Sequence, residues 1–268
     1  MSSETAAVVT LTLYGFIVLA VIGWQIISFR QNWKAWLLYI VQRLHNGLMY
    51  HWRSNRKCPF PDEGAGLIIA NHCSPVDPML VWMNHHLGSP SHRIRVFSFM
   101  MAKEYYEIPG LRWLCEALLS IPIDRTGRDI APIKDALEHL RNGRLVAIFP
   151  EGKINLGEGL LEGITGVAWL ALTAKVPVYP VFIHNSPRGN SMVEPFYRST
   201  RVHVSYGDPF DVSEFYGQRK TQELLRKVTD LMMERLAELG GVTYRDERAY
   251  SDSHIDNVET IPMRKAAG

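Results

Sequence analysis

From about Gly64 onward, short apolar runs alternate with longer stretches in which apolar residues recur at helical spacing. The short runs predict buried strands, and the longer stretches predict helices. We expect strands at residues 67–70, 94–99, 119–123, 145–149, 178–183 and 202–206, and helices at 78–87, 111–117, 130–140, 160–174 and 221–239. This alternation predicts an α/β fold in which helices cover a mostly parallel sheet.

The N-terminal segment contains a run, residues 8–29, with no charged side chain. At about 1.5 Å per residue, a helix of this length is about 33 Å long, close to the ~30 Å hydrocarbon core of a bilayer. The alternatives are a buried helix and a cleaved signal peptide. A signal peptide fits poorly, because Glu4 but no Lys or Arg precedes the run and no small-x-small cleavage site follows it. We therefore interpret residues 1–30 as a transmembrane anchor. Arg30 and Lys34 come next, so the positive-inside rule predicts a single-pass protein with the bulk of the chain in the cytoplasm.

Residues 31–58 form a second segment in which apolar residues continue at helical spacing. They are Trp33, Trp36, Leu37, Ile40, Val41, Leu44 and Leu48, with Lys34, Arg43 and Arg53 among them or just beyond. One interpretation is an amphipathic helix that lies in the membrane interface, with its tryptophans at headgroup depth. The other is a helix packed on the following domain, and periodicity alone does not separate the two.

Size, charge and cysteine content limit the class of protein. The 268 residues, 47% of them hydrophobic, suffice for one domain with a full core, which we assign to residues 59–240, followed by a polar tail at 241–268. The net charge of +2 implies no strong electrostatic partner, and no basic stripe or zinc-finger spacing indicates nucleic acid. The cysteines are odd in number and scattered along the chain, at positions 58, 73 and 115. This favours a reducing compartment and argues against a disulfide framework, and the cysteines also lack the spacing of a zinc site.

The most informative motif, NHCSPVDP at residues 71–78, lies between the first expected strand and a helix. Open α/β sheets place their sites at the carboxyl ends of strands. In this turn Asp77 can fold back onto the imidazole of His72 and fix its tautomer, so that His72 acts as a general base towards a hydroxyl. The alternative is that Asp77 only caps the helix.

Three further segments accompany expected strands. Residues 123–125 end with Arg125, which can bind a phosphate or pair locally with Asp124 or Asp129. Glu151-Gly152-Lys153 precedes a glycine-rich stretch and a helix expected to begin near Leu160, which together offer backbone N–H groups to an anion; the alternative is an ordinary glycine-rich turn. The prolines of residues 176–181 restrict that strand to a sheet edge or to its own start.

Together these four segments resemble the ordered blocks of the phospholipid/glycerol acyltransferase family, whose members include 1-acylglycerol-3-phosphate acyltransferases. Asn71-His72 with Asp77 is similar to the first block, residues 123–125 to the second, 149–152 to the third and 176–180 to the fourth. The resemblance spans roughly residues 67–183. It departs from the family in the third block, where Thr-Arg-Ser commonly follows Glu-Gly and this chain has Lys153-Ile154-Asn155.

The resemblance implies transfer of a fatty acyl group from acyl-CoA or acyl-carrier protein to the hydroxyl of a membrane lysophospholipid, foremost 1-acylglycerol-3-phosphate. It makes His72 the base and Asp77 its orienting partner. The implied substrate-binding residues are Asn71, Arg125, Glu151, Gly152 and Lys153. The thioester is a substrate, so no cofactor or metal is implied. Two alternatives stay open: another acceptor, such as a lyso-ornithine lipid, and a non-catalytic, membrane-anchored lipid-binding protein.

Two competing site chemistries are disfavoured. Cys73 is adjacent to His72 in a turn, which does not give the thiol–imidazole contact that a nucleophile needs. A metal site built from His72, Asp77, His85 and His86 is also disfavoured, because neighbouring side chains on a helix point apart.

Overall fold

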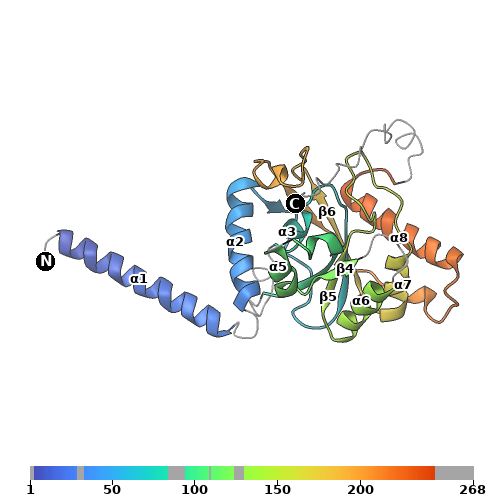
Figure 1. Cartoon of the computed structure of the whole chain (residues 1–268), viewed down its shortest axis with the longest axis horizontal. Helices are drawn as coiled ribbons and strands as arrows, with labels where there is room; N and C mark the ends of the chain where they lie inside the picture. The colour runs from blue at the N-terminus through green and yellow to red at the C-terminus, as the bar shows by residue number, and fades with distance from the viewer. Residues whose placement is uncertain (1–2, 29–32, 84–93, 109, 124–129, 245–268) are drawn as a thin grey trace, which may run out of the picture.

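The computed structural model describes residues 3–28, 33–83, 94–108, 110–123 and 130–244, which form a seven-stranded sheet with helices on both faces and a separate N-terminal helix (Figure 1). The helices are α1 (Ser3–Ser28), α2 (Trp33–Met49), α3 (Asp77–Val81), α5 (Leu111–Ala117), α6 (Ala131–Arg141), α7 (Gly166–Ala174) and α8 (Gln222–Gly240), with 3-10 helices η1 (Lys103–Tyr105), η2 (Glu194–Phe196) and η3 (Ser213–Phe215). The strands are β1 (Arg53–Ser54), β2 (Gly66–Ala70), β3 (Phe97–Ala102), β4 (Ile121–Ile123), β5 (Leu145–Ile148), β6 (Val178–His184) and β7 (His203–Tyr206).

The strand order is β1-β7-β6-β2-β5-β3-β4. β2 is central and runs parallel to both neighbours, β5 and β6, and β3 and β4 continue in the same direction. β7 is antiparallel to β6, and the short β1 pairs with β7. The mostly parallel α/β fold predicted from the sequence is therefore confirmed. Its consequence for function is that the carboxyl ends of β2, β5 and β6 meet at one edge of the sheet.

The two faces of the sheet are covered by different helices. α2 and α3 cover one face, and α6, α7 and α8 cover the other (Figure 1). In β2, Ile68 and Ala70 belong to the first apolar cluster, whereas Leu67 and Ile69 belong to the second. Burial on both faces explains why this strand is apolar at every position after Gly66.

The helix expected over residues 160–174 begins only at Gly166, so that expectation was wrong in its first part. The N–H of Leu161 donates to the Glu151 carboxylate at 3.0 Å, and the N–H of Ile164 donates to the Pro150 carbonyl at 2.9 Å. These distant acceptors hold residues 160–165 in a loop. The positive end of the helix consequently lies farther along the chain than the sequence pattern indicated.

The sequence pattern restricts the prolines of residues 176–181 to a sheet edge or to the start of the strand. Pro177 does lie just before β6, but Pro180 lies inside it, and β6 is not an edge strand because it lies between β7 and β2. β7 ends at Tyr206, and pairing on that side resumes only where Val178 meets Phe210. Pro180 lies beside this interruption, where the N–H of Gly207 donates to its carbonyl at 3.0 Å. The missing N–H of Pro180 therefore faces a gap in the ladder, so an interior proline is tolerated.

α1 extends away from the domain (Figure 1), and it is the one described helix long and apolar enough to cross a membrane, over Glu4–Trp24. α2 packs on the domain through one face, where the side-chain amides of Gln42 and Asn46 donate to the Met79 carbonyl at 2.7 and 3.1 Å. Its opposite face exposes an apolar stripe, which consists of Trp33, Leu37, Val41, Leu44 and Leu48. The sequence pattern left open whether this helix packs on the domain or presents an apolar face to the membrane interface. α2 packs on the domain through one face and also exposes an apolar stripe on the other.

Candidate active site

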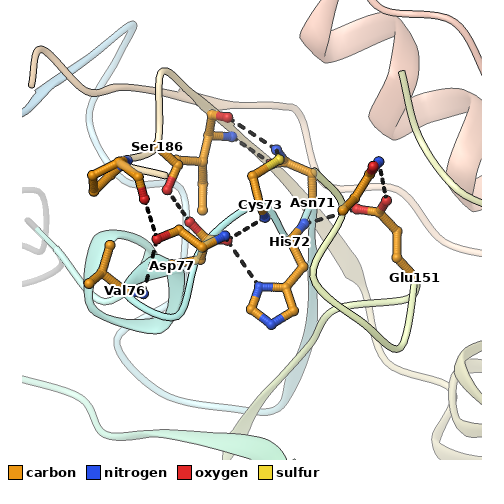
Figure 2. A network of polar contacts seen from close by, with 11 residues as sticks. Asn71, His72, Cys73, Val76, Asp77, Glu151 and Ser186 are labelled. Atoms are coloured by element: carbon orange, nitrogen blue, oxygen red, sulfur yellow. Dashed lines mark hydrogen bonds and ion pairs between the residues drawn. The ribbon is translucent and has the colours of Figure 1, made fainter. Parts of the chain in front are cut away.

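The turn between β2 and α3 brings Asp77 back onto His72. His72 Nδ1 lies 3.0 Å from Asp77 Oδ2 (Figure 2). The Asp77 side chain is fully buried, whereas 18% of the His72 side chain is exposed. Because an ionised carboxylate only accepts hydrogen bonds, Nδ1 carries the proton and Nε2 keeps a lone pair for a substrate.

Asp77 also organises the turn that precedes it. Its Oδ2 accepts from the backbone N–H of Cys73 at 2.6 Å and of Ser74 at 2.8 Å, and its Oδ1 accepts from the Ser186 hydroxyl (Figure 2). Both backbone donors come before α3, and the side chain caps no N–H of the helix itself. The helix-cap alternative therefore does not describe what Asp77 does.

The end of β6 fixes one side of this turn. The Asn71 amide donates to the Ile183 carbonyl at 3.1 Å and accepts from the Ile183 N–H at 2.7 Å. The Ser74 hydroxyl donates to the Pro187 carbonyl at 2.5 Å. Asn71 is 1% exposed, so its amide serves the fold here, and contact with a substrate stays a prediction.

The loop after β5 fixes the other side. Glu151, 4% exposed, accepts from the His72 N–H at 2.9 Å through Oε1 and from the Asn155 side-chain amide at 2.8 Å through Oε2. The Asn155 N–H in turn donates to the His72 carbonyl at 2.6 Å. Burial raises the pKa of Glu151, and its N–H donors oppose that rise. Glu151 therefore positions the backbone of His72, while the substrate contact expected from the sequence stays a prediction.

The other expected substrate-binding residues have different surroundings. Gly152 has φ +71°, a left-handed conformation that favours glycine, in a turn where its N–H donates to the Phe149 carbonyl at 3.0 Å. The Lys153 side chain is exposed on the loop that follows. Arg125, like His85 and His86, lies outside the described residues. The roles of Arg125 and Lys153 at a headgroup thus stay predictions.

Phe149 stacks on the His72 imidazole, with ring centroids 4.2 Å apart and planes 16° apart. Phe99 stacks behind it at 6.2 Å. The aromatic face restrains the plane of the imidazole and gives the site an apolar wall. An apolar wall suits a fatty acyl chain better than a charged substrate group.

Cys73 is adjacent to His72, but its thiol is a weak nucleophile near neutral pH. Burial, helped by the Asp77 and Glu151 charges, raises the pKa of its thiol to about 11. The thiol is therefore protonated near neutral pH, and only the thiolate is a strong nucleophile. Within the part of the chain that the structure describes, no three His, Cys, Asp or Glu residues are grouped so that they could hold a metal ion.

Sequence reasoning missed three contributors to this site: Ser186, Ser74 as a link to β6, and Asn155. In the sequence, Asn155 is distinguished only as part of the departure from the family pattern. Ser186 follows β6 by two residues, at the sheet edge where β2 also ends. The available signal was a hydroxyl residue just past the end of an expected strand, although the sequence does not show that this strand lies beside β2.

The chain is also similar to known acyltransferases. Residues 52–184 match the family model described as acyltransferase. The 1-acyl-sn-glycerol-3-phosphate acyltransferase of Salmonella typhimurium is 36% identical over 179 residues, which cover 66% of this chain and 69% of that protein. The protein of the same name from Bacillus subtilis is 21% identical over 202 residues, covering 75% and 92%.

A solved structure shares the fold. The 1-acyl-sn-glycerophosphate (LPA) acyltransferase PlsC from Thermotoga maritima aligns with a TM-score of 0.58 at 21% identity, covering 88% of this chain and 98% of that one. The resemblance drawn from four sequence blocks is thus confirmed by a family model, by sequence relatives and by the fold. The chain belongs to the phospholipid/glycerol acyltransferase family and is a glycerolipid O-acyltransferase.

Proposed function

We propose that the protein transfers a fatty acyl group from an acyl thioester to the free hydroxyl of 1-acylglycerol-3-phosphate, giving phosphatidic acid. The observation that carries this proposal is the His72–Asp77 contact at 3.0 Å, which leaves the Nε2 lone pair of a partly exposed imidazole available. The names of the Salmonella and Bacillus relatives support 1-acylglycerol-3-phosphate as the acceptor.

In this mechanism, Nε2 of His72 accepts the proton of the acceptor hydroxyl as the oxygen attacks the thioester carbonyl. The carbon–sulfur bond then breaks, and the proton passes from Nε2 to the departing thiolate. The products are an ester and a free thiol, and no acyl-enzyme forms. The Asp77 carboxylate stabilises the transient imidazolium, and general base catalysis of this kind contributes about 10²–10⁴-fold.

The test is an acceptor panel with the purified full chain in phospholipid–detergent micelles. Labelled acyl-CoA and labelled acyl-carrier protein are each offered with 1-acylglycerol-3-phosphate, other lysophospholipids and a lyso-ornithine lipid. We expect labelled phosphatidic acid and an equal amount of free thiol. A clear preference for the lyso-ornithine lipid would show that this lipid, and not 1-acylglycerol-3-phosphate, is the acceptor. Absence of thioester consumption by folded, lipid-bound protein would favour a non-catalytic lipid-binding protein.

We further propose that α1 is a single-pass anchor and that the catalytic domain lies on the cytoplasmic side. The apolar span Glu4–Trp24 and the positive residues that follow it, Arg30 and Lys34, support this orientation. Protease digestion of sealed inverted vesicles tests it. The domain should be digested, whereas a tag placed before Met1 should be protected.

A further inference from the structure

Arg188 joins the two loops that flank the His72–Asp77 turn. Its guanidinium donates to the carbonyl of Leu156 at 2.8 Å through Nη1 and to that of Gly157 at 3.4 Å through Nη2. On one side, Arg188 follows Ser186, the donor to Asp77, by two residues. On the other side, Leu156 follows Asn155, whose N–H donates to the His72 carbonyl. The guanidinium is thus attached to two segments that both contact the catalytic turn.

The charge of Arg188 has no carboxylate partner among the described residues. The ion pairs of this part of the chain do not include Arg188, and its side chain is exposed. The nearby Glu194 instead accepts from the Asn190 N–H at 2.7 Å and lies 3.9 Å from Arg198. A guanidinium has five N–H donors, so two bonds to neutral carbonyls leave donors and a full charge available to an anion.

This charge acts on the catalytic turn. The pKa of Cys73 is raised chiefly by burial and further by Asp77 and Glu151, and Arg188 opposes this rise. Cys73 is the residue after His72, so the Arg188 charge acts within one residue of the proposed base.

The chemistry of the proposed acceptor fits this position. In 1-acylglycerol-3-phosphate, the carbon next to the one bearing the free hydroxyl carries the phosphate. A cation joined to the loops that flank the base therefore lies where the acceptor phosphate can reach it, whereas the phosphates of the donor lie at the far end of the pantetheine arm from the thioester. We propose that Arg188 binds the phosphate of the acceptor headgroup and so selects a phosphate-bearing lysolipid, an inference that rests on the proposed function.

The experiment compares Arg188→Gln and Arg188→Lys with a matched control, Arg95→Gln. Arg95 likewise donates to backbone carbonyls, those of Pro61, Gly64 and Gly143, but near the amino-terminal ends of β2 and β5, opposite the site edge. Each protein is assayed as the full chain in the same micelles. The acceptors are 1-oleoylglycerol 3-phosphate and 1-oleoylglycerol, and donor concentration is varied separately. Inhibition by sn-glycerol 3-phosphate gives a readout that does not need turnover of the neutral lipid.

We expect Arg188→Gln to lower kcat/KM for the phosphate-bearing acceptor by roughly 10- to 100-fold, the loss of one charge-assisted contact, while the neutral acceptor changes by less than about 3-fold. Inhibition by sn-glycerol 3-phosphate should weaken in parallel. Arg188→Lys should recover part of the loss, because lysine keeps the charge without the guanidinium geometry. Arg95→Gln should lower Tm and leave the ratio of the two acceptors unchanged.

Three results would overturn the inference: an unchanged acceptor ratio in Arg188→Gln, an equal loss with both acceptors, or a rise confined to the donor KM. If the wild-type protein transfers acyl groups to no lysolipid, the proposed function itself fails. If the wild type acylates 1-oleoylglycerol 3-phosphate and Arg188→Gln keeps its selectivity, only the role of Arg188 fails.

Discussion

Ser186 donates its hydroxyl hydrogen to Asp77 Oδ1, so the carboxylate that faces His72 is tied to the loop after β6 (Figure 2). Ser74, in the same turn as His72, returns a hydrogen bond to the carbonyl of Pro187. The two serines thus cross-link the catalytic turn and the β6 loop in both directions. This cross-link fixes the direction from which Asp77 approaches the imidazole.

Ser186→Ala should lower kcat by about tenfold while KM for both substrates stays within about twofold, because Asp77 loses one donor and some of its orientation. Ser186→Thr should restore most of the activity, since threonine keeps the hydroxyl. Ser205→Ala is the control. Ser205 is also buried, and its hydroxyl on β7 lies 3.0 Å from the imidazole of His184 on β6, away from the His72–Asp77 contact. Steady-state kinetics of the three variants decide this. A KM effect equal to the kcat effect would contradict a positioning role.

His72→Ala and Asp77→Asn should differ in stability although both lose activity. His72→Ala should reduce turnover by at least about 100-fold and keep Tm close to wild type, because the imidazole is partly exposed. Asp77→Asn should lower both turnover and Tm. The amide N–H that replaces one carboxylate oxygen must then face a hydrogen-bond donor, because the carboxylate accepts from donors that include Cys73 N–H and Ser74 N–H. Turnover and thermal unfolding measured on the same preparations check this. More than about a tenth of wild-type turnover in His72→Ala would exclude its role as base.

Local patterns predicted six of the seven described strands and the His72–Asp77 contact, because these depend on residues close in sequence. They missed β1, whose residues 53 and 54 fall within the segment 31–58 that the sequence pattern predicts to be helical. The strand at residues 67–70 and the contact between Asp77 and His72, five positions apart, can be predicted without knowledge of the strand order. The contacts of Asn71 with Ile183 and of Ser186 with Asp77 exist only because β6 lies beside β2. Sequence periodicity does not encode that order.

The errors have the same physical origin. The helix expected from Leu160 is displaced because Glu151 captures the Leu161 N–H. Pro180 lies inside the sheet because the neighbouring ladder is interrupted at Gly207. In both cases the arrangement of residues distant in sequence, and not the local pattern, decides the outcome.

Cys73 should react slowly with iodoacetamide, and its rate should rise about tenfold per pH unit from pH 7 to 10 without levelling off. The thiolate fraction grows with pH until the pKa of about 11, whereas an ordinary thiol levels off near about 8.5. Peptide mass spectrometry of the folded protein measures the rate at this residue, and urea-unfolded protein is the control. A plateau below pH 9 in the folded protein would contradict the burial of this thiol.

Cys73→Ala should keep activity within a few-fold of wild type, because direct transfer needs no thiolate. Rapid-quench samples of the wild type with labelled donor should show no acyl group on the protein. An acyl thioester mapped to Cys73 would instead establish a two-step transfer.

The apolar stripe of α2 should contribute membrane contact beyond that of α1. Leu44 and Leu48 are 62% and 75% exposed, although the opposite face of the helix packs on the domain. Exposed leucines at helical spacing beside an anchor are typical of a helix in the membrane interface. A chain that lacks residues 1–30 should therefore still float with lipid vesicles.

Leu44→Glu should abolish most of that residual flotation, because a carboxylate replaces an apolar side chain at the interface. Tm should stay within about 2 °C of the parent, since changes at exposed positions rarely alter stability by more than about 0.5 kcal/mol. Gln222→Glu on α8 adds the same charge at an exposed position of a different helix and should leave flotation unchanged. In the full chain, Leu44→Glu should slow transfer to an acceptor embedded in vesicles more than transfer to a short-chain acceptor in solution. Equal flotation of the truncated Leu44 and Gln222 variants would mean that the apolar stripe of α2 does not hold the protein at the bilayer.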